Sequence, residues 1–292
     1  MQQFTLTGFA DEIAGDLTSQ IDGLQKLDIH FMEMRGVDGD NLIFHPDDKV
    51  TEIRKRLDDA GISLSALGSP LGKIEIEEPF EKHFEDFKRA VEIAHQMDTR
   101  NIRMFSFYMP DEGGALTTEN KAAFRGQVFE RIGKFVDYAS QNDVVLLHEN
   151  EKGIYGDQAR ECRELMDTFA GDHFKAIFDF ANFVQVGQDT LEAYDMLKDF
   201  VVYVHVKDAL KEDGRVVPAG YGDGNVAAIL KKLKDKGYEG FLSLEPHLFH
   251  FTGFAGLERG NAVMKEPAGK ELNEFEAFSL AHESLLKILA DI

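Results

Sequence analysis

The stretch DVVLLHENEKGIYGDQARECRELMDTFAGDHFKAIFDF, residues 143–180, holds one full repeat of the pattern that decides the fold. Two short apolar runs, 143–150 and 174–180, enclose a segment near 157–170 with helical spacing. Two strands joined through a helix are parallel, since a parallel crossover needs a dozen or more residues. The stretch therefore predicts a strand–helix–strand unit, and each of its strands carries an acidic residue near its end, Glu149 and Asp179.

The same alternation continues in both directions from this unit. Further strand-like runs, each followed by a helix-like segment, lie at 4–10, 30–36, 62–70, 101–107, 201–208 and 240–246. Eight such units in 292 residues, with no linker between them, predict an α/β fold: a single-domain (β/α)8 TIM barrel over residues 1–292. No G-x-G-x-x-G follows the first run, which weakens the dinucleotide-binding alternative. A segment after the eighth strand, about 247–271, is expected to be a long loop that forms a lid or a subunit contact.

Composition narrows the classes of partner. The chain has 32 basic and 53 acidic residues, a formal net charge of −21, so a nucleic-acid partner is not expected. The single cysteine, Cys162, suits a reducing compartment. The N-terminus has no basic leader and no apolar run is long enough for a membrane helix, so we expect a cytoplasmic protein with no membrane partner. Homo-oligomerisation is left open.

Four consecutive predicted strands end in residues that can bind a metal. They are Glu149, Asp179, His205 and Glu245. Active sites of TIM barrels lie at the carboxyl ends of the strands, and the alternation of side chains allows each residue to face the barrel mouth. A strand-end acid is more often a helix cap and a lone histidine more often a core residue, but four in register favour a shared cation. Mixed oxygen and nitrogen ligands suit one divalent ion: Mn²⁺, Mg²⁺, Co²⁺ or Zn²⁺.

The order Glu, Asp, "HVKD" and "LSLEP" on the last four strands resembles the xylose isomerase-like TIM barrels, and the resemblance extends from "GFADE" to the last helix. It implies that Glu149, Asp179, His205 and Glu245 bind one metal and that Glu149 and Glu245 form the catalytic acid/base pair. Many relatives have a second histidine where this chain has Asn182. Asparagine is a poor metal ligand that can still bond a sugar hydroxyl.

The resemblance implies a metal-dependent isomerase or epimerase of a sugar, sugar phosphate or inosose-like substrate. The bound ion acidifies a proton next to a carbonyl and stabilises the resulting enediolate, while two carboxylates exchange the proton. The predicted substrate-binding residues are Glu33, Asn182, Lys207 and His247. The alternatives are a dehydratase of an inosose-like substrate, a metal-dependent phosphodiesterase, and a non-catalytic sugar-binding barrel. The phosphodiesterase needs more histidines and a basic groove.

Overall fold

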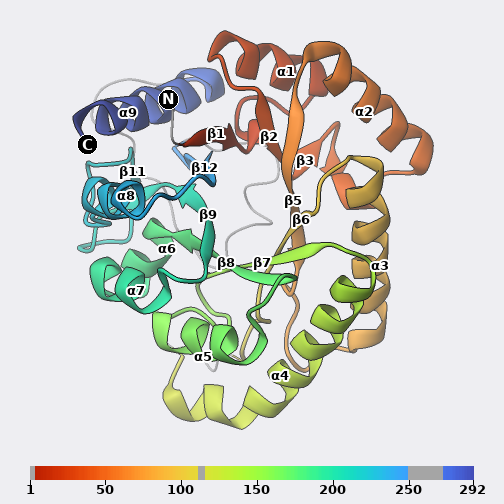
Figure 1. Cartoon of the computed structure of the whole chain (residues 1–292), viewed down its shortest axis with the longest axis vertical. Helices are drawn as coiled ribbons and strands as arrows, with labels where there is room; N and C mark the ends of the chain where they lie inside the picture. Colours follow the sequence, from red (N-terminus) through yellow and green to blue (C-terminus); the bar gives the residue numbers. More distant parts are fainter. Residues whose placement is uncertain (1–3, 111–115, 249–271) are drawn as a thin grey trace.

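The computed structural model describes residues 4–110, 116–248 and 272–292, and it confirms the predicted single-domain barrel (Figure 1). In chain order the strands of the barrel are β1 (Thr5–Gly8), β2 (Phe31–Met34), β5 (Ser63–Leu71), β6 (Asn101–Met104), β7 (Val145–Glu149), β8 (Phe174–Asp179), β9 (Val201–Val206) and β12 (Phe241–Leu244). Their spatial order is β1-β12-β9-β8-β7-β6-β5-β2, with every paired neighbour parallel. β1 and β2 also lie side by side, which nearly closes the ring.

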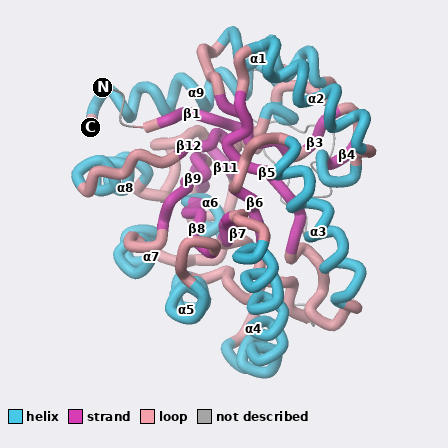
Figure 2. The backbone as a smooth tube through the Cα atoms, turned by 45° about the vertical axis from the view of Figure 1, so that its right-hand side comes forward, coloured by secondary structure: helices cyan, strands magenta, loops and turns pink. Residues whose placement is uncertain are grey.

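Helices surround the strands, which occupy the centre of the molecule in Figure 2. The eight predicted helices are α1 (Leu17–Lys26), α2 (Asp47–Ala60), α3 (Phe80–Gln96), α4 (Thr118–Gln141), α5 (Ala159–Phe169), α7 (Thr190–Leu197), α8 (Val226–Asp235) and α9 (Glu274–Asp291). Local sequence sets their ends: α2 stops at Gly61, which has a φ of +70°, and α9 starts with a capping box of Asn273 and Glu276. Across the described segments, no helix has both the length and the apolar character needed to span a membrane.

The structure adds short elements that the sequence pattern did not predict. They are the helices η1 (Ala10–Glu12), η2 (Leu42–Phe44) and α6 (Phe180–Gln185), and the strand pairs β3 (Gly36–Val37) with β4 (Asp40–Asn41) and β10 (Asp208–Ala209) with β11 (Val216–Val217). Segments of two to six residues are too short to show a period. Of the predicted loop over 247–271, residues 249–271 lie outside the described part of the chain.

The interior of the barrel positions the site. A small apolar cluster, Ala66, Leu147, Ile177 and Tyr203, lies inside the ring, while the large hydrophobic core packs between the strands and the helices. In the sheet register His205 lies beside Asp179 on one side and beside Ser243 on the other. The carboxyl ends of neighbouring strands therefore bring polar side chains to one level of the barrel.

Candidate metal centre

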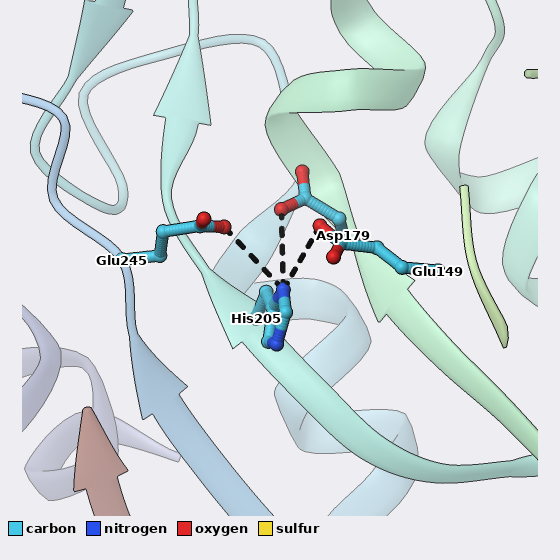
Figure 3. A group of neighbouring side chains, drawn as sticks. All are labelled: Glu149, Asp179, His205 and Glu245. Carbon is cyan, nitrogen blue, oxygen red and sulfur yellow. Dashed lines mark ion pairs between the residues drawn. The ribbon is translucent and has the colours of Figure 1, made fainter. Parts of the chain in front are cut away.

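Glu149, Asp179, His205 and Glu245 converge at the carboxyl end of the barrel, with one ligand atom from each lying within 4.8 Å of the others. Figure 3 shows Glu149 and Asp179 approaching the imidazole from one side and Glu245 from the other. His205 Nδ1 lies 3.0 Å from Glu149 Oε1, 3.4 Å from Glu245 Oε2 and 3.9 Å from Asp179 Oδ2. The four predicted ligands therefore surround one point.

The chemistry of this cluster fits a divalent cation. All four side chains are buried, and neither Asp179 Oδ2 nor His205 Nδ1 has a hydrogen-bond partner within the described residues. A buried polar atom left without a partner is costly, and native proteins rarely keep one without a reason. Three carboxylates and an imidazole supply the oxygen and nitrogen donors that Mn²⁺, Zn²⁺ and related ions accept. We conclude that the donor set can hold such an ion.

The pKa values of the cluster show how its members depend on one another. Burial tends to raise the pKa of Glu149, but the nearby His205 and Arg103 outweigh it and lower the pKa to about 2. Burial raises the pKa of Asp179 to about 7 in spite of Lys207. Burial tends to lower the pKa of His205, yet the charges of Glu149 and Glu33 raise it well above its ordinary value. A cation bound here would release the protons that Asp179 and His205 hold.

Arg35 lies beside the cluster and links it to the end of β1. Its Nε and Nη2 donate to the two oxygens of Asp11 at 2.8 and 3.1 Å. Nη2 also donates to Glu12 Oε1 at 3.3 Å, and Nη1 donates to Glu245 Oε1 at 3.2 Å. The guanidinium stacks over the ring of Phe9 at 4.3 Å. Arg35 therefore fixes the orientation of Glu245.

Two further cations contact the carboxylates of the cluster. Arg103 Nη1 donates to Glu149 Oε2 at 3.2 Å and lies 3.8 Å from Glu245 Oε1, so one guanidinium reaches both predicted acid/base residues. Lys207 Nζ lies 2.9 Å from Glu245 Oε2 and 3.2 Å from Asp179 Oδ2. Lys207 is buried, which excludes an extended position at the rim. Its predicted contact with substrate stays a prediction.

The apolar run FDFANF, residues 178–183, ends β8 and begins α6 at the same aspartate. Asp179 Oδ1 caps α6 by accepting the Asn182 N–H at 2.7 Å, while Oδ2 faces the cluster. The Asn182 Nδ2 donates to Asn150 O at 2.8 Å and lies 3.4 Å from Glu149 Oε1. The asparagine thus contacts a predicted catalytic carboxylate, and its predicted contact with substrate stays a prediction.

The other two predicted substrate residues lie next to the cluster on different sides. Glu33 is buried against His205, with Nε2 at 3.1 Å from Oε2, and it accepts a hydrogen bond from Ser243 at 2.6 Å. His247 has a φ of +46°, which is uncommon outside glycine. Its N–H donates to Glu12 Oε2 at 2.7 Å, and its Nε2 lies 3.4 Å from Glu245 Oε1.

The sequence interpretation missed four side chains of this site. They are Asp11, Glu12, Arg103 and Ser243. A signal existed for two of them: Arg103 interrupts the apolar run NIRMFSF, and Glu12 lies a few residues after the first strand, near where a TIM barrel places site residues. Ser243 carries no comparable signal, because serine within a strand is ordinary.

Comparison with known proteins agrees with the barrel fold. The family model of the xylose isomerase-like TIM barrel matches residues 21–266. An inosose dehydratase from Clostridium perfringens is 27% identical over 133 residues, which cover 40% of this chain and 45% of the relative. The chain therefore spans less than half the length of that curated relative.

Two solved structures share the fold over the whole chain. A D-allulose 3-epimerase from Methylomonas sp. in complex with D-allulose has a TM-score of 0.74 at 14% identity, covering 99% of this chain and 97% of that one. A crystal structure of the IOLI protein with a zinc atom has a TM-score of 0.73 at 16% identity, covering 99% of each chain. At such low identity these likenesses show the fold.

Proposed function

Because the chain belongs to the xylose isomerase-like TIM barrel family, we propose that it is a divalent-metal-dependent isomerase or epimerase that moves a proton next to the carbonyl of a carbohydrate-like substrate. The observation that carries the proposal is the cluster itself, in which Glu245 and Glu149 reach the same nitrogen of His205 from the left and the right of the view, with Asp179 between them (Figure 3). The D-allulose 3-epimerase and the inosose dehydratase support it, since both names refer to polyhydroxy carbonyl compounds.

The residues that would hold the ion are Glu149, Asp179, His205 and Glu245. When bound, a divalent ion supplies Lewis acidity, which acidifies the carbon-bound proton and stabilises the negative charge of the enediolate. The chain supplies the proton transfer. Glu149, as the carboxylate, removes the proton as a base, and Glu245, after taking up a proton from solvent, returns one to the opposite face of the planar intermediate.

The surrounding cations hold these two carboxylates in place. Arg103 contacts both Glu149 and Glu245, so it restricts how far the pair can rotate away from the substrate. Arg35 and Lys207 hold the two oxygens of Glu245 from different directions. Positioned acid/base groups of this kind typically contribute about 10²–10⁴-fold to a rate.

The charges of the site favour a neutral substrate over a sugar phosphate. Three buried permanent cations, Arg35, Arg103 and Lys207, face six buried carboxylates: Asp11, Glu12, Glu33, Glu149, Asp179 and Glu245. Within the described residues, each of the three cations already contacts at least one of these carboxylates. A divalent ion would bring the group close to neutrality, and a phosphate dianion would find no uncommitted cation among these residues.

A second candidate, a dehydratase, shares the first step. The inosose dehydratase relative favours it. After the same proton removal, expulsion of a hydroxyl group from the neighbouring carbon as water would give an unsaturated ketone in place of an epimer. The structure offers the same base, Glu149, for either outcome.

One experiment tests the shared step and separates the outcomes. Protein loaded in turn with Mn²⁺, Mg²⁺, Co²⁺ and Zn²⁺ is incubated in D₂O with a panel of ketoses and inososes and their phosphates. We expect solvent deuterium on the carbon next to the carbonyl of a neutral substrate. An epimer in the product identifies the epimerase, and a new ultraviolet absorbance from a conjugated ketone identifies the dehydratase. Sugar binding without any isotope exchange would contradict both and favour a non-catalytic barrel.

A further inference from the structure

The two nitrogens of His205 face different environments. Nδ1 faces the three carboxylates of the metal centre, with Glu149 nearest. Nε2 points the other way, toward Glu33, at 3.1 Å from Oε2 and 3.3 Å from Oε1. The rings of Phe9 and Tyr203 pack edge-on against the imidazole, with centroids 5.2 and 5.8 Å away. These contacts hold the ring plane, so the imidazole cannot easily exchange its nitrogens by rotation.

An ionised carboxylate only accepts hydrogen bonds. Glu33 therefore selects the form of His205 in which Nε2 carries the proton and donates it. In a neutral imidazole the other nitrogen, Nδ1, then keeps its lone pair, and a metal ligand needs such a lone pair. Glu33 is itself fixed, because Ser243 Oγ donates to its Oε2 at 2.6 Å.

The surroundings of Glu33 form a polar layer inside the barrel, below the four ligands. Thr7 Oγ1 lies 2.7 Å from Ser65 Oγ, which lies 2.8 Å from the hydroxyl of Tyr203. In the sheet register Thr7 pairs with Ser243, which pairs with His205. Barrel interiors are usually filled by branched apolar side chains, and buried hydroxyls are tolerated when they are hydrogen-bonded. A satisfied polar layer at this level suits a carboxylate that must keep a fixed orientation.

We propose that Glu33 is a positioning residue that holds the Nε2–H of His205, so that Nδ1 is presented to the metal. This inference rests on the metal centre of the proposed function. It adds a role for Glu33, which, in the contacts described above, touches His205 and none of the other three ligands. Glu33 acts through His205 in this role, and its predicted contact with substrate stays a separate prediction.

The test compares metal affinity among three variants, measured by competition with a chromophoric chelator for Zn²⁺ and Mn²⁺. Glu33→Met removes the acceptor at similar length, and we expect affinity to fall about 10–100-fold. Glu33→Gln keeps an oxygen that can accept from Nε2–H, so it should lose less than Glu33→Met. The matched control is Glu161→Gln, which removes another buried carboxylate, one paired with Lys121 at 3.1 Å. Its metal affinity should equal that of the wild type.

A spectroscopic measurement reads the tautomer directly. In zinc-loaded wild-type protein labelled with ¹⁵N-histidine, the signal that disappears in His205→Gln should show a proton on Nε2 and none on Nδ1. A proton on Nδ1 would overturn the proposal, as would folded Glu33→Met that binds metal within about threefold of the wild type. If Glu33→Met shows no cooperative melting transition, the variant is not folded, and the tautomer measurement alone tests the proposal.

The outcomes also separate this proposal from the function on which it rests. Wild-type protein that binds metal, together with Glu33 variants that bind it equally well, would overturn only the role of Glu33. Wild-type protein that takes up no metal would overturn the metal centre and the role of Glu33 with it.

Discussion

Two buried aspartates lie at or just after the carboxyl ends of the neighbouring strands β8 and β9, yet their surroundings differ. Asp179 ends β8, and one of its oxygens, Oδ2, lies buried with no hydrogen bond from the described residues. Asp208 follows β9, and both of its oxygens are satisfied by backbone N–H groups at 2.8–3.0 Å. The four donors are Ala209, Gly220, Gly222 and Gly224.

The glycines explain why Asp208 is so well satisfied. A Cβ on Gly222 would lie 2.4 Å from Asp208 Oδ1, and Gly220 has a φ of +86°. The loop folds around the carboxylate, so Asp208 takes the place that a bound anion takes in other glycine-rich loops. The comparison teaches that burial and position at a strand end do not distinguish a ligand from a structural acid. What differs is the company of each carboxylate: Asp208 is enclosed by backbone N–H groups, whereas Asp179 lies among three other side chains that can bind a metal.

The largest expected effect concerns the proposed acid/base pair, which lies in the same cluster as Asp179. Glu149→Gln and Glu245→Gln should each lower turnover about 10²–10⁴-fold, because each removes a positioned base while keeping a side chain of the same size. Steady-state rates on a substrate identified by deuterium exchange provide the measurement, with Glu161→Gln as the control. Near-wild-type turnover in either variant would remove that glutamate from the acid/base pair.

The next effect concerns the structural acid. Asp208→Ala removes four hydrogen bonds to a charged group, so we expect a loss of unfolding free energy of about 3 kcal/mol or more. For a chain of this size the melting temperature should fall by about 6–12 °C. Metal affinity of the folded variant should equal that of the wild type. If Asp208→Ala loses metal and keeps its melting temperature, the two aspartates have been assigned the wrong way round.

A third buried group, His83, extends the comparison from buried acids to a buried histidine. It accepts the Gly72 N–H at 2.7 Å on Nε2, and burial lowers its pKa from 6.5 to about 4. The unfolded chain binds a proton at pH values where the folded protein does not. The unfolding free energy should therefore decrease as the pH is lowered from 6.5 to 4, by on the order of 2 kcal/mol.

His148, whose pKa burial also lowers to about 4, contributes with the same sign. Denaturant titrations at several pH values should show a shallower fall in His83→Gln than in the wild type. A fall of equal steepness in both proteins would show that His83 is not kept neutral by the fold.

The smallest expected effect is on the stability of metal-free Asp179→Asn. Asparagine can still cap α6, and Lys207, which lies 3.2 Å from Asp179 Oδ2, keeps its contact with Glu245 at 2.9 Å after the substitution. We expect the unfolding free energy of the metal-free protein to change by less than about 1 kcal/mol, while metal affinity drops at least about tenfold. A large destabilisation without metal would mean that Asp179 is structural in the same sense as Asp208.

Much of this fold follows from the sequence, because each of the eight strands has a run of apolar residues and each connecting helix has a 3.6-residue period. The strand-end ligands follow too, since parallel strands bring their carboxyl ends to one rim. Arg35 and Arg103 illustrate what does not follow: their partners lie up to 210 positions away in the chain, and pairing at that distance depends on barrel closure and register. The same holds for Glu33, whose contact with His205 crosses the barrel interior.

The central claim is that Glu149, Asp179, His205 and Glu245 hold one divalent ion. The most direct test is an anomalous difference map from crystals grown with Mn²⁺ or Zn²⁺ and measured above and below the absorption edge of the metal. We predict one strong peak among these four side chains at ligand distances of about 2.0–2.2 Å, with no peak at Asp208. Metal-soaked crystals with no peak in this cluster would contradict the claim.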